Sequence, residues 1–134
     1  MLEEIVIPHA VKTIECEAFS YCSGLTNVTH GNGLEEIGMY SFSLCKSMHR
    51  IVLPNAVKVI KKGAFSLSFG LTSVTLGDGL EEIGVFAFKE CTSLKEIVIP
   101  NTVKTIECEA FSYFSGLTNV TLGEWAGGNW GVCI

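Results

Sequence analysis

The side chains best suited to chemistry in this 134-residue chain are its six cysteines, and their spacing limits what they can do. A zinc site would need a Cys-x-x-Cys pair or a similar one, and the sequence contains none. Cys22, Cys45 and Cys91 lie in one 23-residue frame, which Ser68 and Phe114 share. Since this frame accepts thiol, hydroxyl and ring alike, we predict that these cysteines are buried and pack as small apolar side chains.

Paired carboxylates are a second candidate for catalysis. Glu35 and Glu81 lie 46 residues apart in one frame. Two strand spacings would separate them by roughly 9–10 Å, close to the distance in an inverting glycosidase. Lys58 falls between them, however, and nothing apolar surrounds either carboxylate to raise its pKa. No serine or cysteine has a matching histidine and acid. We therefore expect no catalytic, cofactor or metal site and no enzymatic activity.

His30 interrupts an apolar pattern, because its equivalents 23 residues before and after it are Ile7 and Leu53. An inward-facing imidazole must be hydrogen-bonded or stay neutral. We predict a local irregularity of packing at this residue.

Composition excludes several classes of protein. A hydrophobic fraction of 48% is too high for a disordered chain. The net charge is −5, and nine scattered basic residues form no stripe for a phosphate backbone, so nucleic acid is not expected as a partner. No run approaches 18 apolar residues, so we expect no membrane span. The acidic start, Met1 to Glu4, does not resemble a signal peptide.

A 23-residue repeat organises the whole chain. Its units start at residues 2, 25, 48, 71, 94 and 117, and the last becomes irregular from about residue 123. Each of the five complete units carries a phenylalanine at its eighteenth position, namely Phe19, Phe42, Phe65, Phe88 and Phe111. A repeat of this length predicts one solenoid domain over residues 1–134, in which each unit forms one coil.

The pattern within a unit predicts the shape of the coil. Residues such as Glu4-Ile5-Val6-Ile7 alternate outward and inward, which is typical of a strand. A turn follows at Pro8 or its equivalent, then a second extended stretch such as Val11–Ile14, and then an Ala-Phe-x-x-Cys segment with room for about one helical turn. We expect short parallel strands and little α-helix.

A second period of 46 residues separates two kinds of coil. Odd coils have proline at position 7 and even coils have glycine, as in Pro8 and Gly31. Position 11 alternates lysine and glutamate, in the order Lys12, Glu35, Lys58, Glu81 and Lys104. Because adjacent strands lie about 4.8 Å apart, this column should form a stripe of alternating charge that holds the register.

The motif Leu-x-x-Ile-x-Ile-Pro-x-x-Val-x-x-Ile-x-x-x-Ala-Phe-x-x-Cys resembles the BspA-type, or Treponema pallidum-type, leucine-rich repeat over residues 2 to about 123. The resemblance implies an α/β repeat solenoid, a right-handed superhelix of 23-residue coils. Such repeats occur in surface proteins linked to adhesion and to binding host matrix proteins. It therefore implies a protein ligand and a cell-surface or secreted location.

The cysteine frame and the ends of the chain leave alternatives open. Cys22 and Cys45 would lie on adjacent coils and could form a disulfide. Trp125 and Trp130, in the irregular last unit, could cover the core of the final coil, as a solenoid end requires. No polar cap precedes Leu2, and uncapped ends would allow end-to-end self-association.

The outward-facing strand positions are the candidate binding surface. We single out a strand face for a partner, formed by Arg50, Val52, Ser73, Thr75, Glu96 and Val98. We expect a non-catalytic protein-interaction module, an adhesin-like part of a cell-surface protein. The alternative is a structural spacer that presents another domain and has no ligand of its own.

Overall fold

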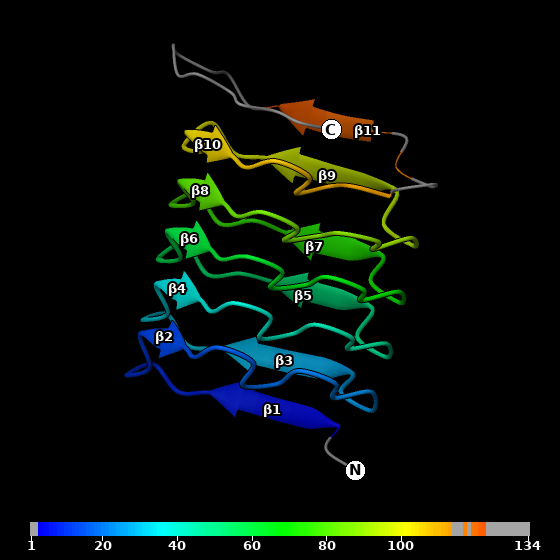
Figure 1. Cartoon of the computed structure of the whole chain (residues 1–134). Helices are drawn as coiled ribbons and strands as arrows, with labels where there is room; N and C mark the ends of the chain where they lie inside the picture. The colour runs from blue at the N-terminus through cyan, green and yellow to red at the C-terminus, as the bar shows by residue number, and fades with distance from the viewer. Residues whose placement is uncertain (1–2, 114–116, 118, 123–134) are drawn as a thin grey trace.

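The computed structural model describes residues 3–113, 117 and 119–122 as a solenoid of parallel strands with coils 23 residues apart (Figure 1). This confirms the predicted fold. The long strands are β1 (Glu4–Ile7), β3 (Asn27–His30), β5 (Arg50–Val52), β7 (Ser73–Thr75), β9 (Glu96–Ile99) and β11 (Asn119–Leu122). The short strands are β2 (Thr13–Ile14), β4 (Glu36–Ile37), β6 (Val59–Ile60), β8 (Glu82–Ile83) and β10 (Thr105–Ile106).

The Ala-Phe-x-x-Cys segment forms consecutive tight turns, and the described part of the chain contains no helix. Two positions of this segment have positive φ in every complete coil, as at Glu17 (59°) and Tyr21 (62°). Left-handed backbone costs a non-glycine residue about 1–2 kcal/mol. The N–H groups of Glu17, Phe19 and Tyr21 donate to carbonyls of the next coil, each at 2.8 Å. The next coil therefore holds a backbone that would be unfavourable in one coil alone.

The phenylalanine column forms the centre of the core. Successive rings of Phe19, Phe42, Phe65, Phe88 and Phe111 stack with centroid distances of 5.4, 5.5, 5.3 and 5.4 Å. The three middle rings are fully buried. Aromatic contacts of this kind contribute about 0.5–1.5 kcal/mol beyond the burial of area. Because each ring lies on its own equivalent, the stack fixes the register of neighbouring coils.

The 46-residue period reappears in the pairing of the strands. The five short strands form one continuous sheet, but the long strands pair two by two, as β1–β3, β5–β7 and β9–β11. Within the described residues, no ladder joins β3 to β5 or β7 to β9. Each pair consists of an odd coil and the even coil after it.

The turns explain why each even coil docks on the odd coil before it. A Cβ at Gly77 would lie 2.5 Å from the Pro54 carbonyl oxygen, so only glycine permits this approach. The Asp78 N–H then donates to Asn55 Oδ1 at 3.0 Å. On the same coil the Thr72 hydroxyl donates to the His49 carbonyl at 2.9 Å. The first pair of coils repeats these contacts, with the Asn32 N–H donating to His9 Nδ1 at 3.0 Å.

Over the described residues, no helix is long and apolar enough to cross a membrane. Trp125 and Trp130, predicted to cover the last coil, lie outside the described residues.

Exchange of whole coils tests this two-coil unit without changing chain length. Residues 71–93, an even coil, can be replaced by a copy of residues 48–70, an odd coil, or by a copy of residues 25–47, another even coil. The odd copy would place a proline, the equivalent of Pro54, at position 77, where Gly77 closely approaches the backbone of the preceding coil. We therefore expect the free energy of unfolding of that variant to be at least ~2 kcal/mol lower than that of the even-coil variant. Urea unfolding at pH 7.5 measures the difference, and equal stabilities would refute the two-coil unit.

Candidate functional site

All six residues of the predicted strand face lie on the surface made by the long strands, and all are exposed. The β5–β7 ladder sets Arg50 opposite Ser73 and Val52 opposite Thr75. Val98 lies on β9, in register with Thr121 of β11. The structure therefore brings four of the six side chains together on one ladder, with Glu96 and Val98 on the next pair of strands.

An apolar stripe runs along this strand face. Val6, Val52 and Val98 are 73%, 49% and 60% exposed, and a threonine in ladder register lies beside each of them. Valine on an exposed strand has good β-propensity but contributes no core packing here. Among the described residues, no group of three His, Cys, Asp or Glu side chains could hold a metal ion. The face offers short, stiff apolar and hydroxyl side chains.

The position-11 column contains one of its predicted ion pairs. Lys104 Nζ lies 3.1 Å from Glu81 Oε1. The hydrogen bond and charge of Lys104, with a smaller contribution from Lys58, lower the pKa of Glu81 below its usual value. A general acid needs the opposite shift. The column therefore fits a role in register.

The cysteine column has a role that sequence reasoning missed. The Cys45 and Cys91 thiols are buried as predicted, whereas Cys22 on the first coil is only partly buried. Each buried thiol donates to the carbonyl of a phenylalanine on the preceding coil, Phe19 at 3.3 Å and Phe65 at 3.1 Å. Ser68 makes the same contact through its hydroxyl at 2.9 Å. The presence of serine among the cysteines was the available signal, because both side chains can donate.

Burial also makes these thiols unreactive. Loss of solvation raises the pKa of Cys45 and of Cys91 to about 12. Thiolate is the nucleophilic form, so neither side chain suits covalent catalysis. Cys22 and Cys45 are free thiols, and the alternative disulfide between them is not formed. Cys133 lies outside the described residues.

Substitution of Cys91 tests the donor role of this column. Cys91→Ser keeps a donor to the Phe65 carbonyl, as Ser68 does for Phe42, whereas Cys91→Ala removes it. We expect the alanine variant to lose about 1 kcal/mol more in free energy of unfolding than the serine variant. Urea titration measures the difference, and Ser68→Ala against Ser68→Cys provides the matched pair. An alanine variant as stable as the serine variant would show that the hydrogen bond carries no weight.

His30 is neutral and unusually placed. Both of its ring nitrogens are buried without a hydrogen-bond partner, and its ring meets that of Phe42 edge-on at a centroid distance of 6.4 Å. Of the two predicted alternatives, the structure therefore selects a neutral ring. Burial lowers the pKa of His30 from 6.5 to about 4.

Stability should depend on pH through His30. Above pH 6.5 the imidazole is neutral in both the folded and the unfolded chain. Between pH 6.5 and about 4 only the unfolded chain binds a proton, so stability falls as the pH drops. His30→Leu should remove roughly 2–3 kcal/mol of the loss measured by urea unfolding between pH 7 and pH 4.5. His49→Leu provides a control for the substitution itself, because it replaces an exposed histidine outside the core by leucine. Equal losses in His30→Leu and wild type would contradict the assignment.

Comparison with solved structures supports the fold. A leucine-rich repeat protein of T. pallidum is similar with a TM-score of 0.85 and 30% identity, over 87% of this chain and 57% of that chain. One from Eubacterium ventriosum has a TM-score of 0.78 and 30% identity, over 85% and 31% of the two chains. One from Bacteroides ovatus has a TM-score of 0.66 and 28% identity, over 98% and 42%. The chain thus spans less than two thirds of each.

Sequence comparison assigns the family. No curated protein matches the sequence. The profile of the BspA type leucine rich repeat region matches six copies over residues 1–118, which is most of the chain. The chain therefore belongs to the BspA-type leucine-rich repeat family.

Proposed function

We propose that this chain is a non-catalytic protein-interaction module whose strand face, Arg50, Val52, Ser73, Thr75, Glu96 and Val98, binds a protein partner. Membership of the leucine-rich repeat family suggests the interaction module. The observation that carries the choice of face is the exposed valine stripe, whose members at Val6, Val52 and Val98 pack against nothing in the core.

The physical properties of the stripe suit protein recognition. Covering exposed valine removes apolar area from water, which favours association by about 25 cal/mol per Å² before the costs of binding. β-branched side chains have few rotamers, so little side-chain entropy is lost when a partner packs on them. The ladder pairs Val52 with Thr75 at a fixed register, so the surface is formed before the partner arrives.

The charged residues beside the stripe would orient the partner. Position 3 of the odd coils carries Glu4, Arg50 and Glu96, all exposed on the strand face. Charges at the rim of an interface contribute more to specificity and association rate than to affinity. A partner with an acidic group opposite Arg50 and basic groups on either side would bind in one register.

The resemblance to surface proteins refines this proposal. We infer an adhesin-like segment of a cell-surface or secreted protein that contacts host or extracellular-matrix proteins. The support is the family membership of residues 1–118 together with an exposed strand face that the fold does not need for packing.

A structural spacer is the second candidate. Residues 11–21 and 103–113 are identical in sequence, although they lie four coils apart. Recent duplication extends a solenoid without adjusting a binding site to one partner. Such a chain would present a neighbouring domain and bind nothing through its strand face.

Substitution of the stripe separates these two candidates. Val52, Thr75 and Val98 changed together to glutamate should lower capture of a partner from host-surface and matrix extract at least ~tenfold, because three charges would enter an apolar contact. Retained proteins are quantified by mass spectrometry against wild type. Ser23, Thr92 and Asn101 changed to glutamate add the same charge elsewhere and should leave capture unchanged.

Two outcomes would contradict binding through the strand face. Equal capture by wild type and by the strand-face variant would reject this face as the binding site. Capture of nothing by wild type would support the spacer. Circular dichroism and thermal unfolding should show that both variants are folded.

A further inference from the structure

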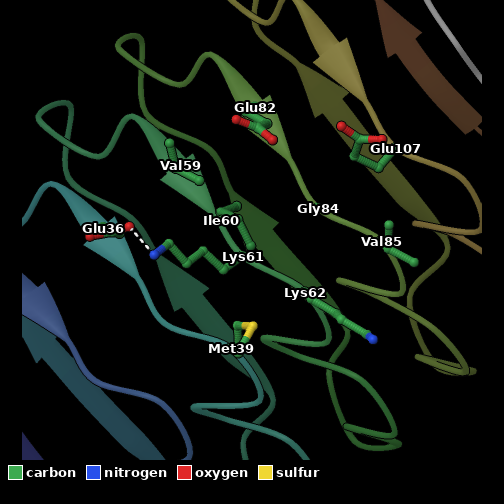
Figure 2. Close-up of a pocket in the computed structure, with 10 residues that line it drawn as sticks. All are labelled: Glu36, Met39, Val59, Ile60, Lys61, Lys62, Glu82, Gly84, Val85 and Glu107. Atoms are coloured by element: carbon green, nitrogen blue, oxygen red, sulfur yellow. Dashed lines mark ion pairs between the residues drawn. The ribbon is translucent and has the colours of Figure 1, made fainter.

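A groove of about 630 Å³ crosses the short strands (Figure 2). The short strands lie on a face of the solenoid different from that of the long strands (Figure 1). Its lining combines the apolar side chains of Met39, Val59 and Val85 with several glutamates and two lysines. Met39 is 41% exposed. The groove is open to solvent along the sheet.

Position 14 of the even coils is glycine, and one of these glycines, Gly84, lines the groove. A Cβ at Gly38 would lie 2.2 Å from the Ile14 carbonyl oxygen, and one at Gly84 would lie 2.8 Å from the backbone of Lys61. The close approach of the coils therefore excludes side chains there. The odd coils carry long side chains at the same position, namely Glu15, Lys61 and Glu107. Because Gly84 has no side chain, a hollow remains between Lys61 and Glu107.

The 46-residue period allows one side of the groove to be compared with the other. Lys61 is the equivalent of Gly38 on the next coil, and its Nζ lies 2.5 Å from Glu36 Oε1 (Figure 2). This pair raises the pKa of Lys61, with smaller contributions from Glu15 and Glu82. Forty-six residues later, Glu82 replaces Glu36 in the frame and Glu107 replaces Lys61. The second site keeps the carboxylate and loses the cation.

Glu82 and Glu107 are both partly buried and have no ion-pair partner in the part of the chain that the structure describes. Figure 2 shows Lys62, the other basic side chain of the groove, pointing away from Glu82. An ion pair at the first site shows that this backbone geometry accepts an ammonium group on the carboxylate. Lys61 interacts with Glu82 only at longer range, because its ammonium group pairs with Glu36. The second site therefore offers two carboxylates that no described basic side chain pairs with directly.

We propose that this groove docks an extended segment of a partner protein that carries a lysine or arginine next to an apolar residue. The cation binds to Glu82 and Glu107 above Gly84, and the apolar residue packs on Val85. Charge complementarity selects this occupant, because a basic side chain matches the two carboxylates and its methylene groups match the apolar lining. This proposal concerns a different face from the proposed function and does not depend on it.

Metal ions and nucleic acids fit the groove less well than a basic peptide. Within the described residues, no three His, Cys, Asp or Glu side chains are grouped to hold a metal ion. A phosphate backbone would meet like charge at Glu82 and Glu107. The arrangement favours one organic cation next to an apolar group, and a peptide with a basic residue beside an apolar residue provides both.

A pair of short blocked peptides tests the proposal on the whole chain. One peptide has a single arginine between two valines, and the other has citrulline in place of arginine. Amide chemical shifts are followed by NMR at low ionic strength. We expect the arginine peptide to shift the amides of Gly84, Val85 and Glu107 and to bind at least ~tenfold more tightly than the citrulline peptide.

Two variants of equal charge change provide the control. Glu107→Lys should complete an internal pair with Glu82, as Lys61 does with Glu36, and lower the affinity of the arginine peptide at least ~tenfold. Glu109→Lys alters an exposed residue of the same coil outside the groove and should leave the affinity unchanged. Both should retain the wild-type thermal midpoint within a few degrees.

Several outcomes would overturn the proposal. They are equal affinity of wild type and Glu107→Lys, equal binding of the two peptides, and shifts centred on Val52 and Thr75. Self-association of wild type that Glu107→Lys abolishes would identify a second copy of the chain as the occupant, which also overturns the partner proposed here. Loss of capture through the strand face leaves these measurements unaffected.

Discussion

The structure depends on one constraint, that each side chain must pack against its own equivalent from the next coil. Phenylalanine satisfies it, because parallel rings offset by about one strand spacing still make good contact, as in the pair Phe42–Phe65 at 5.5 Å. The turns also depend on the neighbouring coil, because the N–H groups of the left-handed residues Glu17 and Tyr21 donate to carbonyls of the following coil. No coil could keep this shape alone, and stability must come from stacking.

Charged side chains and tight turns cannot stack on identical residues of the next coil. The 46-residue period avoids both conflicts, because it alternates lysine with glutamate and proline with glycine. Lysine stacked on lysine would repel, whereas Lys104 on Glu81 attracts. Two proline turns could not approach as Gly77 approaches Pro54. Alternation lets the even coil dock closely on the odd one, and the long-strand ladder is confined to that pair. The short strands do not follow this division and join the five complete coils into one sheet.

The repeat, the strands, the charge alternation and the exposure of Val52 and Val98 were predictable, because each follows from residue types within one coil or from a column of equivalents. The features that were missed depend on contacts with a different position of the neighbouring coil. The Cys91 donor reaches a carbonyl 26 residues away. The split ladder and the turns in place of a helical turn are likewise set by the adjacent coil. Comparison of equivalent positions identifies His30 as an exception in an apolar column. It does not predict whether the ring is hydrogen-bonded or neutral without a partner, which the structure shows.

Departures from the repeat carry the most information about function in such a chain. A column that repeats faithfully is explained by stacking, so its residues need no partner to account for them. His30 breaks its column inside the core, where it leaves two polar atoms unsatisfied and is expected to weaken the fold in acid. At the surface, position 14 of the odd coils holds Glu15, Lys61 and Glu107, and the ion pair of Lys61 with Glu36 shows that a cation fits beside a carboxylate there. The valine stripe follows its column, so the proposal of a partner on the strand face rests on the exposure of Val6, Val52 and Val98. The two faces therefore differ in kind, one a regular apolar surface repeated along the solenoid and the other a single site.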